Sequence, residues 1–324
     1  MAVQDTISPV PKPAFTSDEP EAILRFACEA VHEGVGCALA MLVEIRGGAA
    51  RALGAQMAIR QDGLYCGYVS GGCTEAAVAA EAMAAIEKDL DRFLMLGEGS
   101  KFFDIQLPCG GGITIAIHVI RRGNPLREVL ACLQTRHRIG LKYDPRTQQL
   151  EICRATDTAK WEGERFLRPY RPQTRIVLCG RSIELEATAR IAEAAGYDVA
   201  ILDGTGRHPP SPDFFDEDSA VAFLHHDIDR ELPVLQAALA SNAFYIGALG
   251  SIRTHQRRCE QLNALGFGED SIDRVKAPIG IFAKARDAQS LALSVGLFTP
   301  KVVNCFDEEC RVGGYDAAVA ILLV

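Results

Sequence analysis

Hydrophobic positions in the first half of the chain follow two periods, one typical of helices and one of buried strands. Apolar residues recur at helical spacing between Glu21 and His32, and the Ala- and Glu-rich stretch from Thr74 to Leu90 is also typical of a helix. The run at 37–47 is mostly apolar, as in a buried strand. The other expected elements are two strands within 55–72, a strand broken by a glycine-rich elbow at 102–120, a helix at 124–140 and a hairpin at 141–153. This mixture predicts an N-terminal α/β domain.

The second half of the chain alternates regularly between strands and helices. Expected strands lie at 175–180, 198–203, 220–226 and 243–250, and expected helices at 183–195, 231–239 and 255–265. Such alternation is typical of a parallel sheet covered on both faces, so we expect a Rossmann-like, doubly wound C-terminal domain. A proline-rich arm at 1–20 and a basic, proline-punctuated connector at 165–175 give three predicted segments: a flexible arm at 1–20, the N-terminal domain at 21–165 and the C-terminal domain at 166–324.

Composition and charge narrow the class of protein. Among 324 residues, 42 acidic side chains outnumber 34 Lys and Arg, for a net charge of −8. Nucleic-acid binders usually carry a basic surplus, so we expect no nucleic-acid partner. No apolar run approaches the length of a membrane span, and the N-terminus has no secretory pattern. Eleven scattered cysteines in such a chain are read as reduced thiols of a cytoplasmic protein.

The first candidate site is the loop Ser70-Gly71-Gly72-Cys73-Thr74-Glu75, which joins a predicted strand to a predicted helix. Adjacent glycines allow main-chain N–H groups to converge, and a helix N-terminus adds partial positive charge, which together suit an oxyanion. A thiolate at Cys73 would be favoured there, as a reactive group or a soft metal ligand. The loop alone is equally compatible with a small residue buried at a tight turn.

A second loop with similar chemistry is Pro108-Cys109-Gly110-Gly111-Gly112. Its alternative interpretation is a β-bulge in which Cys109 has no role. Two Cys–Gly loops at strand ends of one domain modestly favour a site lined by both thiols. We therefore predict that Cys73 and Cys109 lie together in one accessible pocket, next to bare main-chain amides.

The strand at 175–180 runs into a helix as in a dinucleotide-binding fold. Gly180 matches the first glycine of G-x-G-x-x-G, whereas Ser182 and Leu185 stand at the other glycine positions. Asp203 closes the next strand at the distance expected of a ribose-binding acid. The two larger side chains would crowd a pyrophosphate, so they argue against NAD(P). A Rossmann-like domain without a nucleotide is equally compatible with this pattern.

Two smaller features complete the candidate chemistry. The segment from His225 to Asp229 follows a predicted strand. A His–Asp pair there can bind a metal or carry protons through His226 or Asp227, and the structural alternative is Asp227 as a helix cap. Cys305 and Cys310 lack the paired spacing of a zinc site, and we assign them no metal.

Several segments, in their order along the chain, resemble the XdhC/CoxI family of molybdoenzyme accessory proteins over about residues 21–298. The most specific are Ser70–Glu75 and Tyr245-Ile246-Gly247-Ala248-Leu249-Gly250-Ser251. The others are Gly47–Arg51, Gly54–Met57, Asp62-Gly63, Cys109–Gly111, Phe223–Asp227 and Ala277–Gly280. The chain departs from the family at Cys179–Ser182, where G-A-G-H is usual, and at 281–286.

The resemblance implies a chaperone that holds the molybdenum cofactor (molybdopterin) while a cysteine desulfurase sulfurates it. The chaperone then passes the cofactor to a xanthine dehydrogenase-type apo-enzyme. It implies that the thiolates of Cys73 and Cys109 lie near the metal or carry sulfur. It also implies that the glycine loops and Arg51 bind the phosphate and the pterin edge. The motifs and the resemblance together give the following expected cofactor-binding residues: Arg51, Gly71, Gly72, Cys73, Cys109, Gly110, Gly111, Gly180 and Asp203. A homodimer is also expected. An NAD(P)-dependent oxidoreductase is the alternative function, and a scaffold with structural cysteines is the third.

Overall fold

The computed structural model describes residues 9–100, 110–203, 210–225, 227–280 and 287–296. The chain divides into two compact units, residues 1–172 and residues 173–324. The boundary expected between residues 165 and 166 lies within a strand of the N-terminal unit, Arg165–Tyr170. The two units divide after Pro172.

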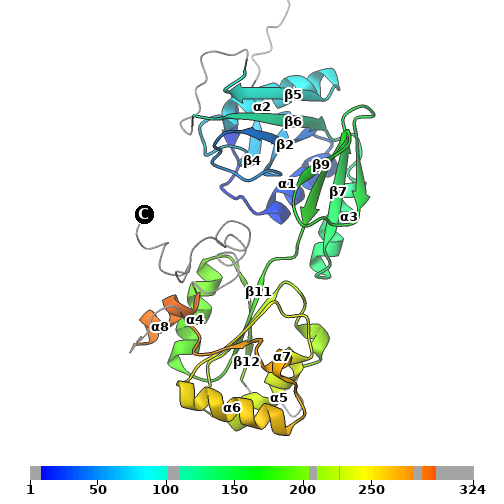
Figure 1. Cartoon of the computed structure of the whole chain (residues 1–324). Coiled ribbons are helices and arrows are strands. Elements are labelled where there is room, and N and C mark those ends of the chain that lie inside the picture. The colour runs from blue at the N-terminus through cyan, green and yellow to red at the C-terminus, as the bar shows by residue number, and fades with distance from the viewer. Residues whose placement is uncertain (1–8, 101–109, 204–209, 226, 281–286, 297–324) are drawn as a thin grey trace, which may run out of the picture. The chain divides into compact units, whose positions relative to one another are not determined.

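A six-stranded sheet is the centre of the N-terminal unit, with the strand order β1-β4-β3-β2-β6-β5 (Figure 1). Its strands are antiparallel neighbours, apart from the parallel pair β1–β4. Their bounds are β1 Lys12–Pro13, β2 Cys37–Arg46, β3 Gln56–Arg60, β4 Leu64–Gly67, β5 Arg92–Gly97 and β6 Gly112–Val119. β2 and β6 are central strands, and their almost continuous apolar sequences match burial on both faces.

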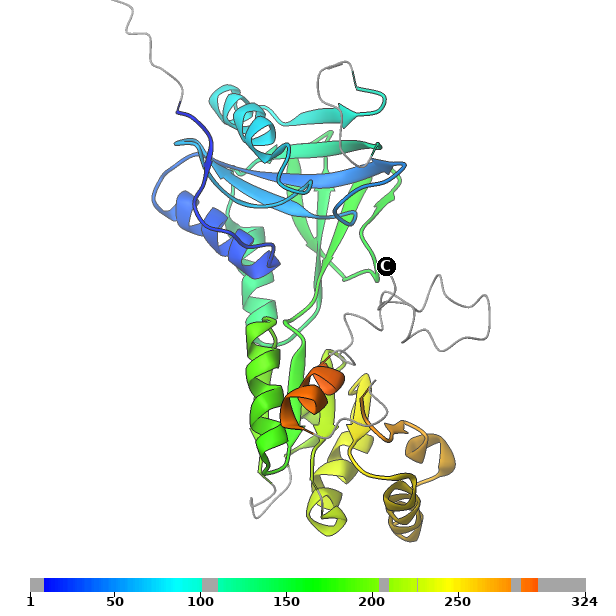
Figure 2. The ribbon, with the colours of Figure 1, turned by 90° about the vertical axis from the view of Figure 1, so that its left-hand side faces the viewer.

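Two hydrophobic cores lie on opposite faces of this sheet. On one face, Ala38, Ala40 and Leu42 of β2 pack with helix α2 (Glu75–Lys88). On the other, Leu39 and Met41 pack with α1 (Pro20–His32), α3 (Asn124–Gln134) and a second sheet, as Figure 2 shows for α1 and α2. Alternate residues of one strand therefore fill both cores. The second sheet has the order β8 (Gln149–Cys153), β7 (Ile139–Asp144), β10 (Arg165–Tyr170), β9 (Lys160–Glu162).

Two expected irregular segments contain strands. Residues 165–170 of the expected connector form β10, in which Phe166 and Tyr170 are buried in the core. In the expected flexible arm, Lys12 and Pro13 pair with β4, and the ring of Phe15 packs edge-on against Phe26 with centroids 5.8 Å apart. Proline content suggested irregular chain in both places, but proline is compatible with a strand where its missing N–H is not needed.

The C-terminal unit contains an all-parallel sheet with the order β12-β11-β13-β14-β15 (Figure 1). The strands are β11 Arg175–Cys179, β12 Asp198–Leu202, β13 Ser219–Phe223, β14 Tyr245–Ala248 and β15 Val275–Lys276. One face packs against α4 (Ile183–Ala194), which contacts α8 (Ala288–Gly296). The other packs against α5 (Ile228–Leu239) and α6 (Ile252–Ala264). Two further short helical segments are η1 (Pro212–Phe214) and α7 (Glu269–Ile272). The expected Rossmann-like, doubly wound architecture is confirmed.

None of the helices in the described part of the chain is both long enough and apolar enough to span a lipid bilayer.

Candidate functional site

Three connections of the N-terminal unit leave the same end of its six-stranded sheet. Strands β2, β4 and β5 end there, while β3 and β6 begin there, because neighbouring strands in this order are antiparallel. The register fixes the alignment, since Gly112 at the start of β6 lies opposite both Arg46 and Gly97. The segment from Gly47 to Ala55, the loop after β4 and the start of β6 therefore lie at one end of the sheet.

Close main-chain contacts bring these connections together. A Cβ atom placed on Gly111 would lie 2.2 Å from the carbonyl oxygen of Gly48, a distance that no side chain tolerates. A Cβ atom on Gly71 would lie 3.3 Å from the Cβ atom of Ala50. The segment 47–50 is thus bordered by Gly111 and by the Cys73 loop, two of the segments predicted to form the site.

The Cys73 loop presents an exposed tip above a buried base. Gly71, Gly72 and Cys73 are exposed, whereas Thr74 and Glu75 are buried. No atom lies within 4 Å of a Cβ placed on Gly72, so the tip is open. The alternative of a small residue buried at a tight turn is therefore wrong for Cys73.

Glu75 is the residue that shapes this loop, and the sequence did not single it out as a site residue. Its buried carboxylate accepts hydrogen bonds from the main-chain N–H groups of Val69 (3.2 Å), Ser70 (2.8 Å) and Thr74 (3.2 Å). The hydroxyl of Ser70 lies 2.9 Å from both of its oxygens. One carboxylate thus holds both ends of the segment from Gly71 to Cys73. The signal for this role is the glutamate of the S-G-G-C-T-E segment, in the first turn of a helix.

Arg51 lies at the border of the same region. Its guanidinium is 2.7 Å from the carboxylate of Asp18 and 5.5 Å from the ring centroid of Tyr68, the residue that follows β4. Both members of the ion pair are partly exposed, so a competing anion can displace Asp18 at little cost. Arg168, on β10, supports the other end of the segment by donating from Nε to the carbonyl oxygen of Gly54 at 2.7 Å.

Cys109 lies outside the described residues, so the convergence of its thiol with that of Cys73 stays a prediction. Its neighbours Gly110 and Gly111 are described and lie at the same end of the sheet. Within the described ranges, no group of three or more His, Cys, Asp or Glu side chains is arranged to hold a metal ion. The described residues thus place an exposed thiol, that of Cys73, beside the exposed glycines Gly71 and Gly72.

Cys73 is the only exposed cysteine among those the structure describes. Burial raises the pKa of Cys37 to about 12 and that of Cys66 to about 11, and it also raises the pKa of Cys179. We expect brief treatment of the native protein with iodoacetamide at neutral pH to label Cys73 at least about 10-fold faster than those three thiols. Peptide mass spectrometry checks this, and comparable labelling of Cys66 and Cys73 would contradict it.

In the C-terminal unit, Gly180 lies where the strand order changes direction. β11 has β12 on one side and β13 on the other, and ligands of such folds bind beyond the carboxyl ends of these strands. A Cβ atom on Gly180 would lie 3.0 Å from the carbonyl oxygen of Leu224, so the loops after β11 and β13 touch. Gly180 belongs to a different unit from Cys73, and the two are described separately.

Asp203, the expected ribose-binding acid, forms an ion pair at 2.9 Å with Arg181. Ser182 caps α4 by accepting from the N–H of Leu185 at 3.2 Å. Nearby, Asp227 accepts from the N–H of Asp229 at 3.1 Å and caps α5, the structural role considered for it, while His226 lies outside the described residues. These side chains act in local structure at the positions where a dinucleotide would need room.

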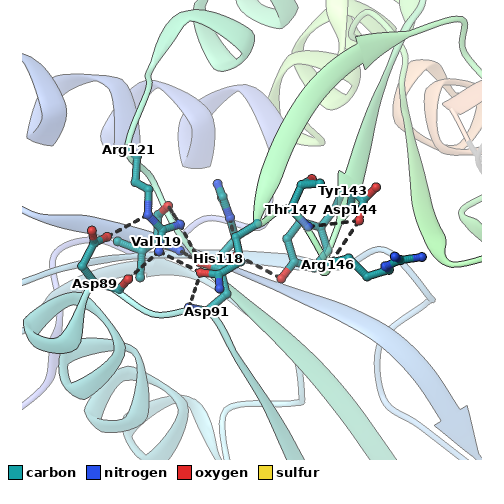
Figure 3. A network of polar contacts seen from close by, with 10 residues as sticks. Asp89, Asp91, His118, Val119, Arg121, Tyr143, Asp144, Arg146 and Thr147 are labelled. Atoms are coloured by element: carbon teal, nitrogen blue, oxygen red, sulfur yellow. Dashed lines mark hydrogen bonds and ion pairs between the residues drawn. The ribbon is translucent and has the colours of Figure 1, made fainter.

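A buried polar network lies at the opposite end of the six-stranded sheet and was not predicted (Figure 3). Asp91, just before β5, is hydrogen-bonded to Nδ1 of His118 (2.6 Å) and to the hydroxyl of Tyr143 (3.0 Å). Arg121 donates to Asp91 at 2.9 Å and forms an ion pair at 2.8 Å with Asp89. The network connects residues at the ends of β5 and β6 with Tyr143 on β7, and so links the two sheets of the unit.

The fold and the site together define a class: a two-domain protein with an N-terminal α/β unit that presents a thiol at a helix N-terminus, and a Rossmann-type C-terminal unit. The profile of the XdhC and CoxI family matches residues 30–96, and that of the XdhC Rossmann domain matches residues 176–296. The chain belongs to the XdhC and CoxI family.

Relatives with longer matches agree with this assignment. The chain is 51% identical to the molybdenum cofactor insertion chaperone PaoD of Escherichia coli K12, over 88% of this chain and 89% of PaoD. It is 23% identical to a Bacillus subtilis protein described as a probable component of xanthine dehydrogenase, over 79% of this chain and 90% of that protein. Its fold matches a crystal structure described as a xanthine dehydrogenase of Bacillus halodurans with a TM-score of 0.67 and 16% identity, covering 91% and 98% of the two chains.

Proposed function

We propose that this protein is a molybdenum cofactor insertion chaperone, which holds the cofactor and delivers it to a molybdoenzyme of the xanthine dehydrogenase type. The observation that carries the proposal is the 51% identity to PaoD over nearly the whole of both chains. At this identity over matches of nearly equal extent, two proteins share their fold. A cysteine desulfurase is the partner that would sulfurate the cofactor while it is held.

The geometry of the N-terminal unit supports this function. The cofactor is a pterin that carries a dithiolene and a phosphate, so its receptor needs soft ligands near the metal and donors near the phosphate. The exposed thiol of Cys73 meets the first need, and the tip formed by Gly71 and Gly72 meets the second. A chaperone must also release its cargo, and an open tip suits release better than an enclosed pocket.

Cofactor binding by these residues is tested by expressing the full chain in a host that makes molybdopterin. Pterin and molybdenum are quantified in the purified wild type, Cys73→Ala, Cys109→Ala and Cys28→Ala. We expect Cys73→Ala and Cys109→Ala to lose most of the bound pterin and molybdenum. Cys28→Ala, a partly buried cysteine of α1, is the matched control and retains both.

The outcomes separate the function from its ligands. Absence of pterin from the wild type would contradict the chaperone function. Unchanged occupancy in both thiol variants would reject Cys73 and Cys109 as ligands and leave the function intact. The alternative of an NAD(P)-dependent oxidoreductase is disfavoured by the side chains of Arg181 and Ser182 at the turn after β11. Hydride transfer from NAD(P)H by the wild type would instead favour the oxidoreductase alternative.

A further inference from the structure

Arg168 is a partly buried cation that has no negative partner in the described part of the chain. It lies on β10 between Phe166 and Tyr170, which face the core on the same side of the strand. Its Nε atom donates to the carbonyl oxygen of Gly54 at 2.7 Å, and its Nη1 atom donates to the carbonyl oxygen of Pro169. The guanidinium is thus held by neutral main-chain oxygens.

Other partly buried arginines of this unit contrast with Arg168. Four of them form an ion pair with a carboxylate: Arg46, Arg51, Arg60 and Arg92. Withdrawing a charge from water without such a partner is costly. Burial accordingly lowers the pKa of Arg168, and the nearby Tyr170 opposes this only in part. Arg168 therefore lacks the counter-charge that these four arginines have.

The guanidinium of Arg168 is also fixed in place. Its carbon atom lies 4.5 Å from the centroid of the Tyr170 ring, and the Tyr170 hydroxyl donates in turn to Oε1 of Gln56 at 2.8 Å. The two main-chain carbonyls take up Nε and Nη1. Nη2 has no partner among the residues that the structure describes, and it is not sealed from solvent. Arg168 thus presents a free and oriented pair of N–H donors on a charged group.

This donor pair lies at the same connection as the candidate site. Gly54, which accepts from Arg168, follows Ala50 by four residues, so the Cα atoms of Ala50 and Gly54 are at most about 14 Å apart. Ala50 in turn borders Gly71 of the Cys73 loop. One short segment therefore links the free guanidinium to the exposed thiol.

The ligand that suits such a group is an oxyanion, because a guanidinium matches the oxygens of a phosphate through charge-assisted hydrogen bonds. A bound phosphate also needs a counter-charge. The N–H groups of the Cys73 loop are neutral, and the charge of Arg51 is paired with Asp18. Of these groups and Arg168, Arg168 alone has an unpaired charge to offer.

We propose that Arg168 binds an oxyanion through Nη2, and that this anion is the phosphate of the molybdenum cofactor. The assignment to the cofactor rests on the proposed function, whereas the anion site itself does not. Inorganic phosphate offers the same chemistry, so it serves as the probe for the site alone.

Arg168→Met tests the proposal, because it removes the charge and keeps an unbranched side chain. The full chain is purified from a host that makes no molybdopterin, and binding of inorganic phosphate is measured by calorimetry at constant ionic strength. We expect Arg168→Met to bind phosphate about 10-fold more weakly than the wild type. After expression in a molybdopterin-making host, it should also retain less pterin.

A second variant keeps the test decisive if Arg168→Met does not fold. Arg168→Lys keeps the charge but lacks the planar fork of donors, so we expect it to bind phosphate about 3-fold more weakly than the wild type. Folding of each variant is checked by the emission of Trp161, which lies opposite Phe166 in the pairing of β9 with β10.

The matched control is Arg165→Met, which removes the same charge from the same strand. The guanidinium of Arg165 is exposed and pairs with Asp144 at 3.1 Å, so this variant should bind phosphate and pterin as the wild type does. Three results would overturn the site: no phosphate binding by the wild type, wild-type affinity in a folded Arg168 variant, or equal weakening by Arg165→Met. Weaker phosphate binding with unchanged pterin content would overturn the assignment to the cofactor. The chaperone function is read separately, from the pterin content of the wild type.

Discussion

Replacing Asp91 by asparagine is expected to lower the free energy of unfolding of the N-terminal unit by about 3 kcal/mol at neutral pH. The Asp91 carboxylate is almost completely buried and accepts from His118, Tyr143, Arg121 and the main-chain N–H of Val119. An amide has one acceptor oxygen in place of two, so at least one of these buried donors loses its partner. The guanidinium of Arg121 also loses the neutralising charge.

The effect of this substitution should depend on pH in a defined direction. Burial by itself raises the pKa of Asp91, but the hydrogen bonds from His118, Val119 and Arg121 outweigh it and lower the pKa below its ordinary value. A carboxyl group with a lowered pKa in the folded state stabilises the protein above its unfolded pKa, about 4, and loses that contribution as the pH falls through the folded pKa. The difference between wild type and Asp91→Asn should therefore shrink below about pH 4.

Urea denaturation followed by tryptophan fluorescence measures this effect in the intact chain. Trp161 is the only tryptophan and lies on β9, with its indole N–H donating to the carbonyl oxygen of Val43 at 2.8 Å, so its emission reports on the N-terminal unit. The matched control is Asp89→Asn, which also alters an ion pair of Arg121 but at an exposed carboxylate. It should change the stability by less than about 1 kcal/mol. An equal decrease in the free energy of unfolding for Asp91→Asn and Asp89→Asn would contradict the larger contribution expected of the buried network.

Gly111→Ala is expected to destabilise the same unit by about 3 kcal/mol and to displace the segment 47–50. The new Cβ would lie 2.2 Å from the carbonyl oxygen of Gly48, 2.6 Å from that of Arg46 and 2.8 Å from the Gly48 nitrogen. All three are main-chain atoms, which cannot rotate aside as a flexible side chain can. The strain can be relieved only by separating the start of β6 from the end of β2, where Arg46 and Gly112 pair.

Gly110→Ala is the control that separates this clash from ordinary backbone strain. Gly110 has φ of 69°, but no atom lies within 4 Å of a Cβ placed on it. Gly110→Ala should therefore lower the free energy of unfolding by only about 1 kcal/mol, the usual penalty for a non-glycine residue in a left-handed conformation. The Trp161 unfolding curve again gives the measurement. A Gly111→Ala protein as stable as Gly110→Ala would contradict the close approach of the two main chains.

The sequence predicted the helices and strands whose apolar residues follow a clear helical or strand period. The Rossmann-like unit follows from regular alternation, and all of its helices and strands expected before 265 are present with small shifts of their ends. β5 was not predicted, because Phe93 and Met95 on this edge strand are about half exposed although apolar. Its short apolar run has no polar face to give the alternation of a half-buried strand.

The sequence predicted where the Cys73 loop lies, between a strand and a helix, but not the side chain that supports it from beneath. A cysteine between a glycine pair and a helix start is visible in the sequence, and the structure exposes Cys73 at that place. Glu75 could not be assigned in the same way, because an acidic residue in the first turn of a helix is most often a solvated one. Only the fold shows that its carboxylate is buried beneath the loop. The network at Asp91 joins residues far apart in sequence, and no local pattern indicates it.

β6 reaches from the candidate site of the N-terminal unit to the Asp91 network. Its first residue, Gly112, lies beside the loops of the candidate site, and its last, Val119, donates to Asp91. One buried strand thus joins the network expected to stabilise the unit to the loops proposed to bind the cofactor. Substitutions at Asp91 should therefore change the stability of the unit while leaving the loops of the candidate site in place.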